Sequence, residues 1–168
     1  MKYLYLIRHA KSSWADLNLA DYDRPLNKRG KTAALEMADR ITAAGISFDL
    51  IVASPAKRAR ATARRIAKRT GYTKKDIVYY KSLYLTDTIE YAKVVKAHLR
   101  QVDCLALVGH NETITSYAEY LTGEDIYNIP TAGIVGISLV SHKAAKERGG
   151  GKMLFFDYPK NLESPLLV

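Results

Sequence analysis

Residues 2–10 read KYLYLIRHA, a short apolar run that ends at Arg8 and His9. A run this short, rich in Tyr, Leu and Ile, is typical of a buried strand. Two more short apolar runs, at 50–53 and 104–108, are each followed by a turn and then by apolar residues at helical spacing. This alternation predicts an α/β domain, a three-layer arrangement with a mostly parallel central sheet and helices on both faces.

Four helices are predicted from apolar residues that recur every three or four positions. Their buried faces are formed by Ala34, Met37, Ala38 and Ile41; by Ala59, Ala63, Ile66 and Ala67; by Tyr91, Val94, Val95 and Leu99; and by Ile114, Tyr117, Ala118 and Leu121. Gly45, Gly71 and Gly123 are natural stops for three of these helices. Pro55 suits the first turn of the second helix.

Three further strands are predicted, at 77–80, 134–140 and 153–156. Residues 10–29 are polar and irregular, which predicts a loop. A second loop, rich in glycine, is expected at 149–151 between the last two strands.

The composition suits one folded domain. The chain has 168 residues, of which 48% are hydrophobic and 26% charged, which excludes a disordered or fibrous chain. No linker or repeat is visible, so we expect a single domain over 1–168. Cys104 is the one cysteine, which excludes an internal disulfide and a multi-cysteine metal site. The apolar run at 3–7 is too short for a signal peptide or a membrane span, so we expect a cytoplasmic protein without membrane contact.

Basic residues are concentrated in one segment. The net charge is +9, and residues 57–75 contain nine Lys and Arg and no acid. Such a cluster attracts phosphates, nucleic acid or acidic protein surfaces, although a solvated helix face has the same appearance.

The side chains that follow the strands predict the chemistry. In parallel sheets ligands bind beyond the carboxyl ends of the strands, so Arg8, His9, Arg58 and His110 are expected to converge. Two arginine forks bind phosphoryl oxygens, and a neutral imidazole can attack phosphorus in line. The second histidine, if protonated, stabilises the equatorial oxygens. Because no acidic cluster follows these strands, the pattern predicts phosphoryl transfer without a metal or cofactor, through a phosphohistidine intermediate.

Each of these residues is weak evidence by itself. An Arg-His dipeptide is too short to be specific, His110 alone is more typical of an ordinary turn histidine, and Arg58 alone could be one more solvated base. The prediction depends on their combination, with each residue just past a strand.

Several segments resemble one known family, the histidine phosphatase superfamily with its phosphoglycerate-mutase-like fold. Residues 6–10 (LIRHA), 54–63 (SPAKRARATA) and 108–111 (VGHN) resemble its first histidine, second arginine and second histidine segments. Residues 23–30 (DRPLNKRG) and 130–133 (PTAG) are similar to the loop before its first helix and the turn before its late strand. The resemblance therefore extends from residue 3 to about residue 140.

The resemblance implies a role for each matched residue. His9 is then the nucleophile that becomes phosphorylated, Arg8 and Arg58 bind the phosphoryl oxygens, and His110 completes the phosphate pocket. The chain is thereby expected to be a hydrolase, a metal-independent phosphatase.

Residues 8–14 (RHAKSSW) and 82–85 (SLYL) resemble the small bacterial phosphohistidine phosphatases within this superfamily. Mutases and larger phosphatases carry an insertion after the third strand, with an acid that protonates the leaving alcohol. Only about a dozen residues separate Gly71 from Leu83, so no such insertion fits here. An imidazole leaves as a base whose conjugate acid has a pKa near 6.5, so it needs far less help than an alkoxide. A site without a dedicated acid should therefore favour phosphohistidine over phosphate esters.

Five further residues are candidates for the site. Asp87 and Glu90 are the nearest candidates for a general acid, although their spacing is that of a capping box, which is the favoured interpretation. Ser12, Asn27 and Asn111 are candidates for substrate binding. They are also ordinary loop and N-cap residues.

Among the remaining side chains, Trp14 lies in the loop beside His9 and is a candidate for the rim of the pocket. We interpret His98 and His142 as surface residues and Cys104 as a small core hydrophobe.

The predicted function is removal of phosphate from phosphohistidine in a protein partner, with the basic helix docking an acidic phosphorelay-type domain. One alternative is a phosphatase of small phosphorylated metabolites, esters or anhydrides, at the same site. The other is a basic module that binds phosphate or nucleic acid without turnover; the lack of a helix-turn-helix, zinc or RNP motif argues against nucleic acid. The sequence leaves open the physiological substrate, the leaving-group acid, the oligomeric state and the role of residues 143–152 and 158–168.

Overall fold

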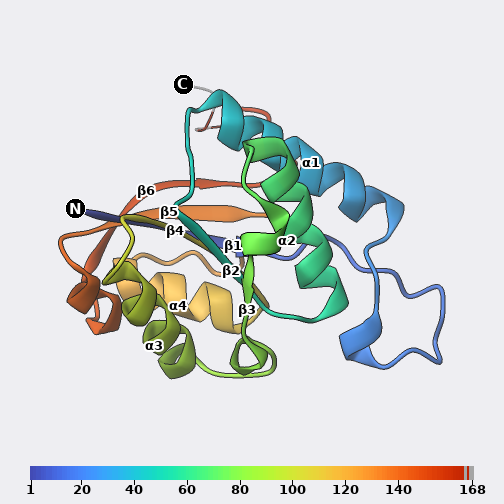
Figure 1. Cartoon of the computed structure of the whole chain (residues 1–168), viewed down its shortest axis with the longest axis horizontal. Coiled ribbons are helices and arrows are strands. Elements are labelled where there is room, and N and C mark those ends of the chain that lie inside the picture. Colours follow the sequence, from blue (N-terminus) through green and yellow to red (C-terminus); the bar gives the residue numbers. More distant parts are fainter. Residues whose placement is uncertain (165, 167–168) are drawn as a thin grey trace.

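The computed structural model describes residues 1–164 and 166. In this part of the chain a six-stranded sheet has the order β3-β2-β4-β1-β5-β6 (Figure 1). Its strands are β1 (Lys2–Arg8), β2 (Leu50–Ala53), β3 (Val78–Tyr79), β4 (Cys104–Gly109), β5 (Ile134–Leu139) and β6 (Gly151–Asp157). The first four strands are parallel, β5 pairs antiparallel with β1, and β6 pairs antiparallel with β5. The predicted mostly parallel sheet is confirmed.

Helices cover both faces of the sheet, as predicted (Figure 1). The α-helices are α1 (Lys28–Ala43), α2 (Lys57–Thr70), α3 (Thr88–Leu99) and α4 (Thr113–Thr122). The short 3-10 helices are η1 (Asp21–Asp23), η2 (Lys74–Asp76), η3 (Lys81–Leu83) and η4 (His142–Lys146). Within the described residues, none of the helices combines the length and apolar character that a membrane crossing requires.

The strands contribute to two cores at once. Leu4 and Leu6 of β1 pack in the cluster beneath α3 and α4, whereas Tyr5 and Ile7 pack in the cluster beneath α1 and α2. Successive side chains of a strand point to opposite faces, and here each face is covered. This is why the central strands are continuous apolar runs. Full burial of each Leu or Ile side chain stabilises the fold by about 2 kcal/mol.

Two helix starts differ from the predicted positions. Helix α1 begins at Lys28, inside the predicted loop 10–29, because the side chain of Asn27 accepts a hydrogen bond from the Gly30 amide and caps the first turn. Helix α2 begins at Lys57, two residues after Pro55, so Pro55 precedes the helix and does not form its first turn.

Two strands also differ from their predicted bounds. The predicted strand 77–80 is reduced to Val78–Tyr79, which pairs only with β2 at the edge of the sheet. In the predicted glycine loop, Gly151 already begins β6, because it pairs with Leu139 of β5. One domain over 1–168 remains a prediction. In the segment 158–168, to which the sequence assigns no role, residues 165, 167 and 168 lie outside the described residues.

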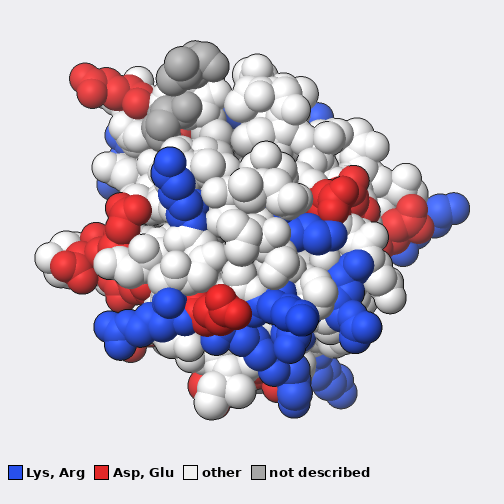
Figure 2. All heavy atoms as spheres, turned by 90° about the vertical axis from the view of Figure 1, so that its left-hand side faces the viewer, with Lys and Arg blue, Asp and Glu red and all other residues white. Residues whose placement is uncertain are grey.

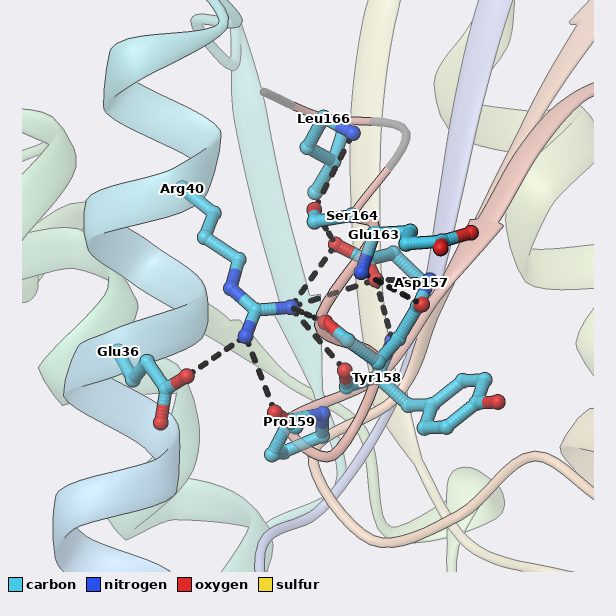
Figure 3. A network of polar contacts seen from close by, with 9 residues as sticks. Glu36, Arg40, Asp157, Tyr158, Pro159, Glu163, Ser164 and Leu166 are labelled. Carbon is cyan, nitrogen blue, oxygen red and sulfur yellow. Dashed lines mark hydrogen bonds and ion pairs between the residues drawn. The ribbon is translucent and has the colours of Figure 1, made fainter. Parts of the chain in front are cut away.

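The segment that follows β6 is held against α1 by a buried polar network (Figure 3). Asp157 is fully buried, and its carboxylate accepts hydrogen bonds from Nη1 of Arg40 at 3.2 and 3.3 Å and from the hydroxyl of Ser164. Nη2 of Arg40 donates to Glu36 at 2.6 Å and to the carbonyl of Pro159 at 3.0 Å. One arginine of α1 therefore fixes the path of the chain beyond the sheet.

Candidate active site

The parallel strands place the predicted residues at one edge of the sheet. In the register of the sheet, Arg8 at the end of β1 lies opposite Gly109 at the end of β4. His9 and His110 are the next residues, and their ring centroids are 5.1 Å apart. Arg58 reaches the same place from the first turn of α2. The structure therefore brings the four side chains together, whereas their catalytic roles remain predictions.

His9 is held in one orientation by two hydrogen bonds. Its Nδ1 lies 2.7 Å from the carbonyl oxygen of Ala10, which can only accept, so Nδ1 carries the proton. Nε2 then has a lone pair, and the Nε–H of Arg58 donates to it at 3.3 Å. The amide of Ala10 is itself fixed by the hydroxyl of Thr62 at 2.9 Å. The imidazole is 8% exposed and presents an unprotonated nitrogen to the site.

Arg58 connects His9 to an acid that the sequence analysis missed. Its Nη1 donates to the backbone carbonyl of Asp21 at 2.6 Å, and its Nη2 donates to the Asp21 carboxylate at 2.9 Å. The hydroxyl of Tyr84 donates to the same carboxylate oxygen at 2.6 Å. Three of the five guanidinium N–H groups are thus occupied, and two are left for a ligand.

His110 is positioned by buried hydroxyl groups. Its Nε2 lies 2.7 Å from Oγ of Ser54, and its backbone N–H donates to the hydroxyl of Tyr91 at 3.0 Å. Tyr91 approaches so closely that a Cβ at position 109 would overlap its hydroxyl, so this position requires glycine. The Ser54 hydroxyl can donate to Nε2 or accept from it, and in the tautomer in which it donates the ring proton is on Nδ1. That nitrogen is buried and has no hydrogen-bond partner within the described residues.

Arg8 presents a second buried donor. Nη1 of Arg8 donates to the carbonyl of Ile129 at 2.9 Å, which anchors one end of the guanidinium. Its Nε, like Nδ1 of His110, is buried and unpartnered in the described part of the chain. Buried donors without acceptors are costly, so this arrangement is suited to an anion that supplies the missing oxygens.

Arg24 is another basic residue that the sequence analysis missed. Its Nη2 donates to Oγ of Ser12, and its guanidinium lies 3.4 Å above the centre of the Trp14 ring. Trp14 is 68% exposed, so the stacked pair lies at the surface, and its place at the rim of the pocket stays a prediction. The predicted candidate Ser12 thus contacts Arg24 in this structure.

Burial favours the neutral form of both histidines. Desolvation lowers the pKa of His9 to about 4, against the bond to Ala10, and the charges of Arg58 and Arg8 lower it further. Desolvation likewise lowers the pKa of His110 to about 3, and His9 and Arg58 add to this effect. The lowered pKa of His9 suits a neutral nucleophile. A protonated His110, as the sequence analysis considered, requires the negative charge of a bound phosphate.

The predicted substrate-binding amides are engaged elsewhere. Oδ1 of Asn27 accepts from the Gly30 amide at the start of α1. In Asn111, Oδ1 accepts from the hydroxyl of Thr115 and Nδ2 donates to Asn128, both at 2.6 Å. Both side chains thus have structural partners, and their predicted role in substrate binding stays a prediction.

The candidate acids have structural partners. Oδ1 of Asp87 caps α3 by accepting a hydrogen bond from the Glu90 amide at 3.0 Å. This bond is the one that the capping interpretation of the sequence predicts. Glu90 pairs with Lys93 at 3.5 Å. A hollow of about 730 Å³ beside His110 is lined by Asp87 and by Glu112, an exposed acid that the sequence analysis did not single out.

Two predicted surface or core residues are half-buried. Nε2 of His98 lies 2.7 Å from the hydroxyl of Tyr80, so His98 is not simply a surface residue. Cys104 donates to the carbonyl of Ser47 and is only partly buried at the start of β4. Across the described residues, no group of three or more His, Cys, Asp or Glu side chains is placed to hold a metal ion.

Comparison with known proteins agrees with this fold. The sequence model of the histidine phosphatase superfamily (branch 1) matches residues 4–83. A crystal structure from Agrobacterium tumefaciens, of a protein assigned as the phosphohistidine phosphatase SixA, is 29% identical, covers 94% of this chain and 98% of its own, and has a TM-score of 0.82. The protein histidine phosphatase SixA complexed with tungstate shares the fold at a TM-score of 0.84, with 18% identity and coverage of 95% and 99%.

One relative found by sequence is a longer protein. An uncharacterised chloroplastic protein of Arabidopsis thaliana is 32% identical over 131 residues, which are 73% of this chain and 60% of that protein. The chain thus spans well under two thirds of this relative.

The fold and the paired histidines and arginines define a protein of the phosphoglycerate-mutase-like class. Within that class, the model of the histidine phosphatase superfamily matches residues 4–83, and the chain as a whole is similar to the small SixA proteins. These matches support the prediction of a phosphatase hydrolase.

Proposed function

We propose that the chain is a phosphatase that works through a phosphorylated His9 and acts on phosphohistidine in a protein. The observation that carries this proposal is the surroundings of His9. Its unprotonated Nε2 is adjacent to Arg58, while the buried donors Arg8 Nε and His110 Nδ1 have no acceptor in the described residues. A phosphoryl group bound there would satisfy both donors and lie in front of the nucleophile.

The reaction has two displacements. In the first, Nε2 of His9 forms a bond to phosphorus while the bond from phosphorus to the substrate imidazole breaks. The leaving nitrogen keeps the electron pair and takes a proton from solvent. In the second, water attacks the phosphorus, loses a proton to solvent, and releases inorganic phosphate as the His9 nitrogen recovers its lone pair. Arg8, Arg58 and His110 neutralise the phosphoryl oxygens in both steps.

The substrate class is inferred from the leaving group. Asp87 caps α3 and Glu90 pairs with Lys93, so both predicted acids have other partners. Without a dedicated acid, a phosphoramidate is a better substrate than an alkyl ester, because a departing imidazole is far less basic than an alkoxide. The names of the SixA structures, one with bound tungstate, support the same reaction on a tetrahedral oxyanion.

Trapping the intermediate tests the proposal. Brief incubation with a labelled phosphoramidate, quenched in alkali, is expected to leave acid-labile phosphate on His9. The His9→Ala variant should carry none, while His98→Asn, a change at a histidine outside the site, should label as the wild type does. Label on any other residue, or turnover that survives His9→Ala, would contradict the intermediate.

A second measurement tests the substrate class. A peptide carrying phosphohistidine and the same peptide carrying phosphoserine are compared at equal concentration. We expect turnover of the first to exceed that of the second by at least about 100-fold, the scale of missing acid catalysis. Equal rates would instead support the alternative, a phosphatase of small esters.

A further inference from the structure

A basic groove runs along the exposed side of α2. It has a volume of about 730 Å³ and extends from Tyr22 and Asp23 of η1 to Lys74 of η2. Its basic lining consists of Lys57, Arg60, Arg64, Arg65, Lys68 and Lys74, and Asp23 is the one acid in the lining. We call this feature the α2 groove.

The basic side chains of the α2 groove have no ion-pair partner among the described residues. Among the described residues, ion pairs form at other bases, and none involves the six that line the groove. Arg60 instead lies over the ring of Tyr79, at 5.3 Å from its centre. A row of unpaired cations on a helix raises the local concentration of anionic partners and guides their approach.

Two ends of the groove lining are formed by residues next in sequence to residues of the candidate active site. Tyr22 and Asp23 form one end of the groove, and Asp21, the residue before them in η1, binds Arg58. Lys57 lines the groove, while the next residue, Arg58, faces His9. A chain bound in the groove therefore has its neighbouring segment at the phosphate-binding residues.

Charge alone does not single out α2. Figure 2 shows that Lys and Arg also gather on the end of the molecule at which β1 begins, with acidic side chains among and around them. At that end desolvation lowers the pKa of His142, and the nearby charges of Arg100, Lys143 and Lys96 lower it further. The α2 groove differs because it is hollow and adjoins Arg58.

We propose that the α2 groove docks an acidic segment of the protein substrate, next to the phosphohistidine that reacts with His9. This inference rests on the proposed function. From Lys57 to Lys68 the helix rises about 17 Å, a length that about five extended residues match. Tyr22 is the one aromatic residue of the lining, so the groove lacks the series of aromatic rings on which successive bases stack, and this favours a polypeptide over a nucleic acid.

The test uses two variants with equal charge change. The groove variant is Arg60→Glu with Arg64→Glu and Lys68→Glu, three exposed positions outside the site. The control variant is Lys143→Glu with Lys146→Glu and Lys152→Glu, also exposed. The control positions lie at the opposite edge of the sheet, since β5 ends beside the start of β1. Thermal unfolding checks that both variants fold.

The probes are two peptides with one histidine each, one flanked by glutamates and the other by glutamines. Binding is measured by fluorescence anisotropy on the unphosphorylated peptides, and turnover is measured on the phosphorylated ones and on free phosphohistidine. The groove variant should lose at least about tenfold in affinity and in kcat/KM for the acidic peptide, but not for free phosphohistidine. The control variant should resemble the wild type, and added salt should weaken only the acidic peptide.

The results that would contradict the docking surface differ from those that would contradict the proposed function. Equal losses in both variants, or none in either, would overturn the docking surface. Loss of affinity for single-stranded DNA in the groove variant, with the acidic peptide unaffected, would assign the groove to nucleic acid. If binding depends on the groove but neither phosphoramidate is turned over by the wild type, the docking surface stands and the proposed function fails.

Discussion

Arg58 donates its Nε–H to Nε2 of His9 across 3.3 Å. The bond engages the lone pair that would attack phosphorus, so it must be released when a substrate binds. A phosphoryl group provides the reason, because its oxygens are stronger acceptors for a guanidinium than a neutral imidazole is. Arg58 then exchanges one partner for another, and the nucleophile is freed only when its target is present.

The first prediction concerns the shape of this guanidinium. Arg58→Lys retains the positive charge but loses the Nε–H and the planar fork. We expect kcat to fall by about 100-fold or more, as for loss of a donor to the transition state. Arg64→Lys, at an exposed position of the same helix, serves as the control and should change kcat by less than about twofold. Near-normal turnover by the Arg58 variant would show that charge alone suffices.

The second prediction is a pH dependence of stability. His9 and His110 have pKa values of about 4 and about 3 in the folded protein, below the ordinary 6.5. Between the pKa values of the folded and unfolded states, the unfolded chain binds more protons than the folded protein. The stability that the two neutral histidines contribute is therefore complete above pH 6.5 and is lost as the pH falls toward 4. Between pH 7 and pH 5 the free energy of unfolding should drop by about 2 kcal/mol for each histidine.

Denaturant unfolding at both pH values measures this drop. The variant with His9→Gln and His110→Gln should show a shallower dependence on pH, because two of the four histidines no longer titrate. A double variant whose stability falls as steeply as that of the wild type would place the responsible groups elsewhere. Inorganic phosphate should reduce the drop, since its negative charge raises the pKa of both histidines.

The third prediction concerns Asp21. Its carboxylate binds Arg58 Nη2 at 2.9 Å and accepts from Tyr84, which holds the arginine but also adds a negative charge beside the phosphate-binding groups. Asp21→Asn removes that charge and preserves the size of the side chain. We expect inhibition by inorganic phosphate to strengthen by up to about tenfold, as an unfavourable charge at this distance predicts. Weaker inhibition would mean that orienting Arg58 matters more than the charge. Asp16→Asn, in the same loop, is the matched control.

The sequence and the structure agree where regular elements position the residues. Arg8, His9 and His110 directly follow apolar strands, and parallel strands end at one edge, so their convergence required no knowledge of the loops. The same rule predicted Arg58, because this residue lies in the first turn of the helix that follows β2. Local pattern and topology were enough for these four side chains.

Asp21, Arg24 and Tyr84 could not be predicted in this way. Asp21 and Arg24 lie in an irregular segment with no hydrophobic period, and the partners of Asp21 are 37 and 63 residues away along the chain. At Asn27 the difficulty is local. An asparagine that caps a helix and one whose amide binds phosphate cannot be told apart from the neighbouring sequence. Only the hydrogen bond to Gly30 distinguishes them.

The last prediction separates stability from activity. Asp157 is fully buried and paired with Arg40. This ion pair fixes the segment after β6 to α1 (Figure 3). Asp157→Ala leaves the guanidinium with no buried carboxylate to neutralise it and should lower the free energy of unfolding by about 3 kcal/mol or more. Turnover per folded molecule should be unchanged, because no bond of the network touches the phosphate-binding residues. Asp103→Ala, which removes an exposed partner of Lys2, should cost much less, since water screens that pair. Equal losses in the two variants, measured by denaturant unfolding, would show that the buried network contributes no more than a surface ion pair.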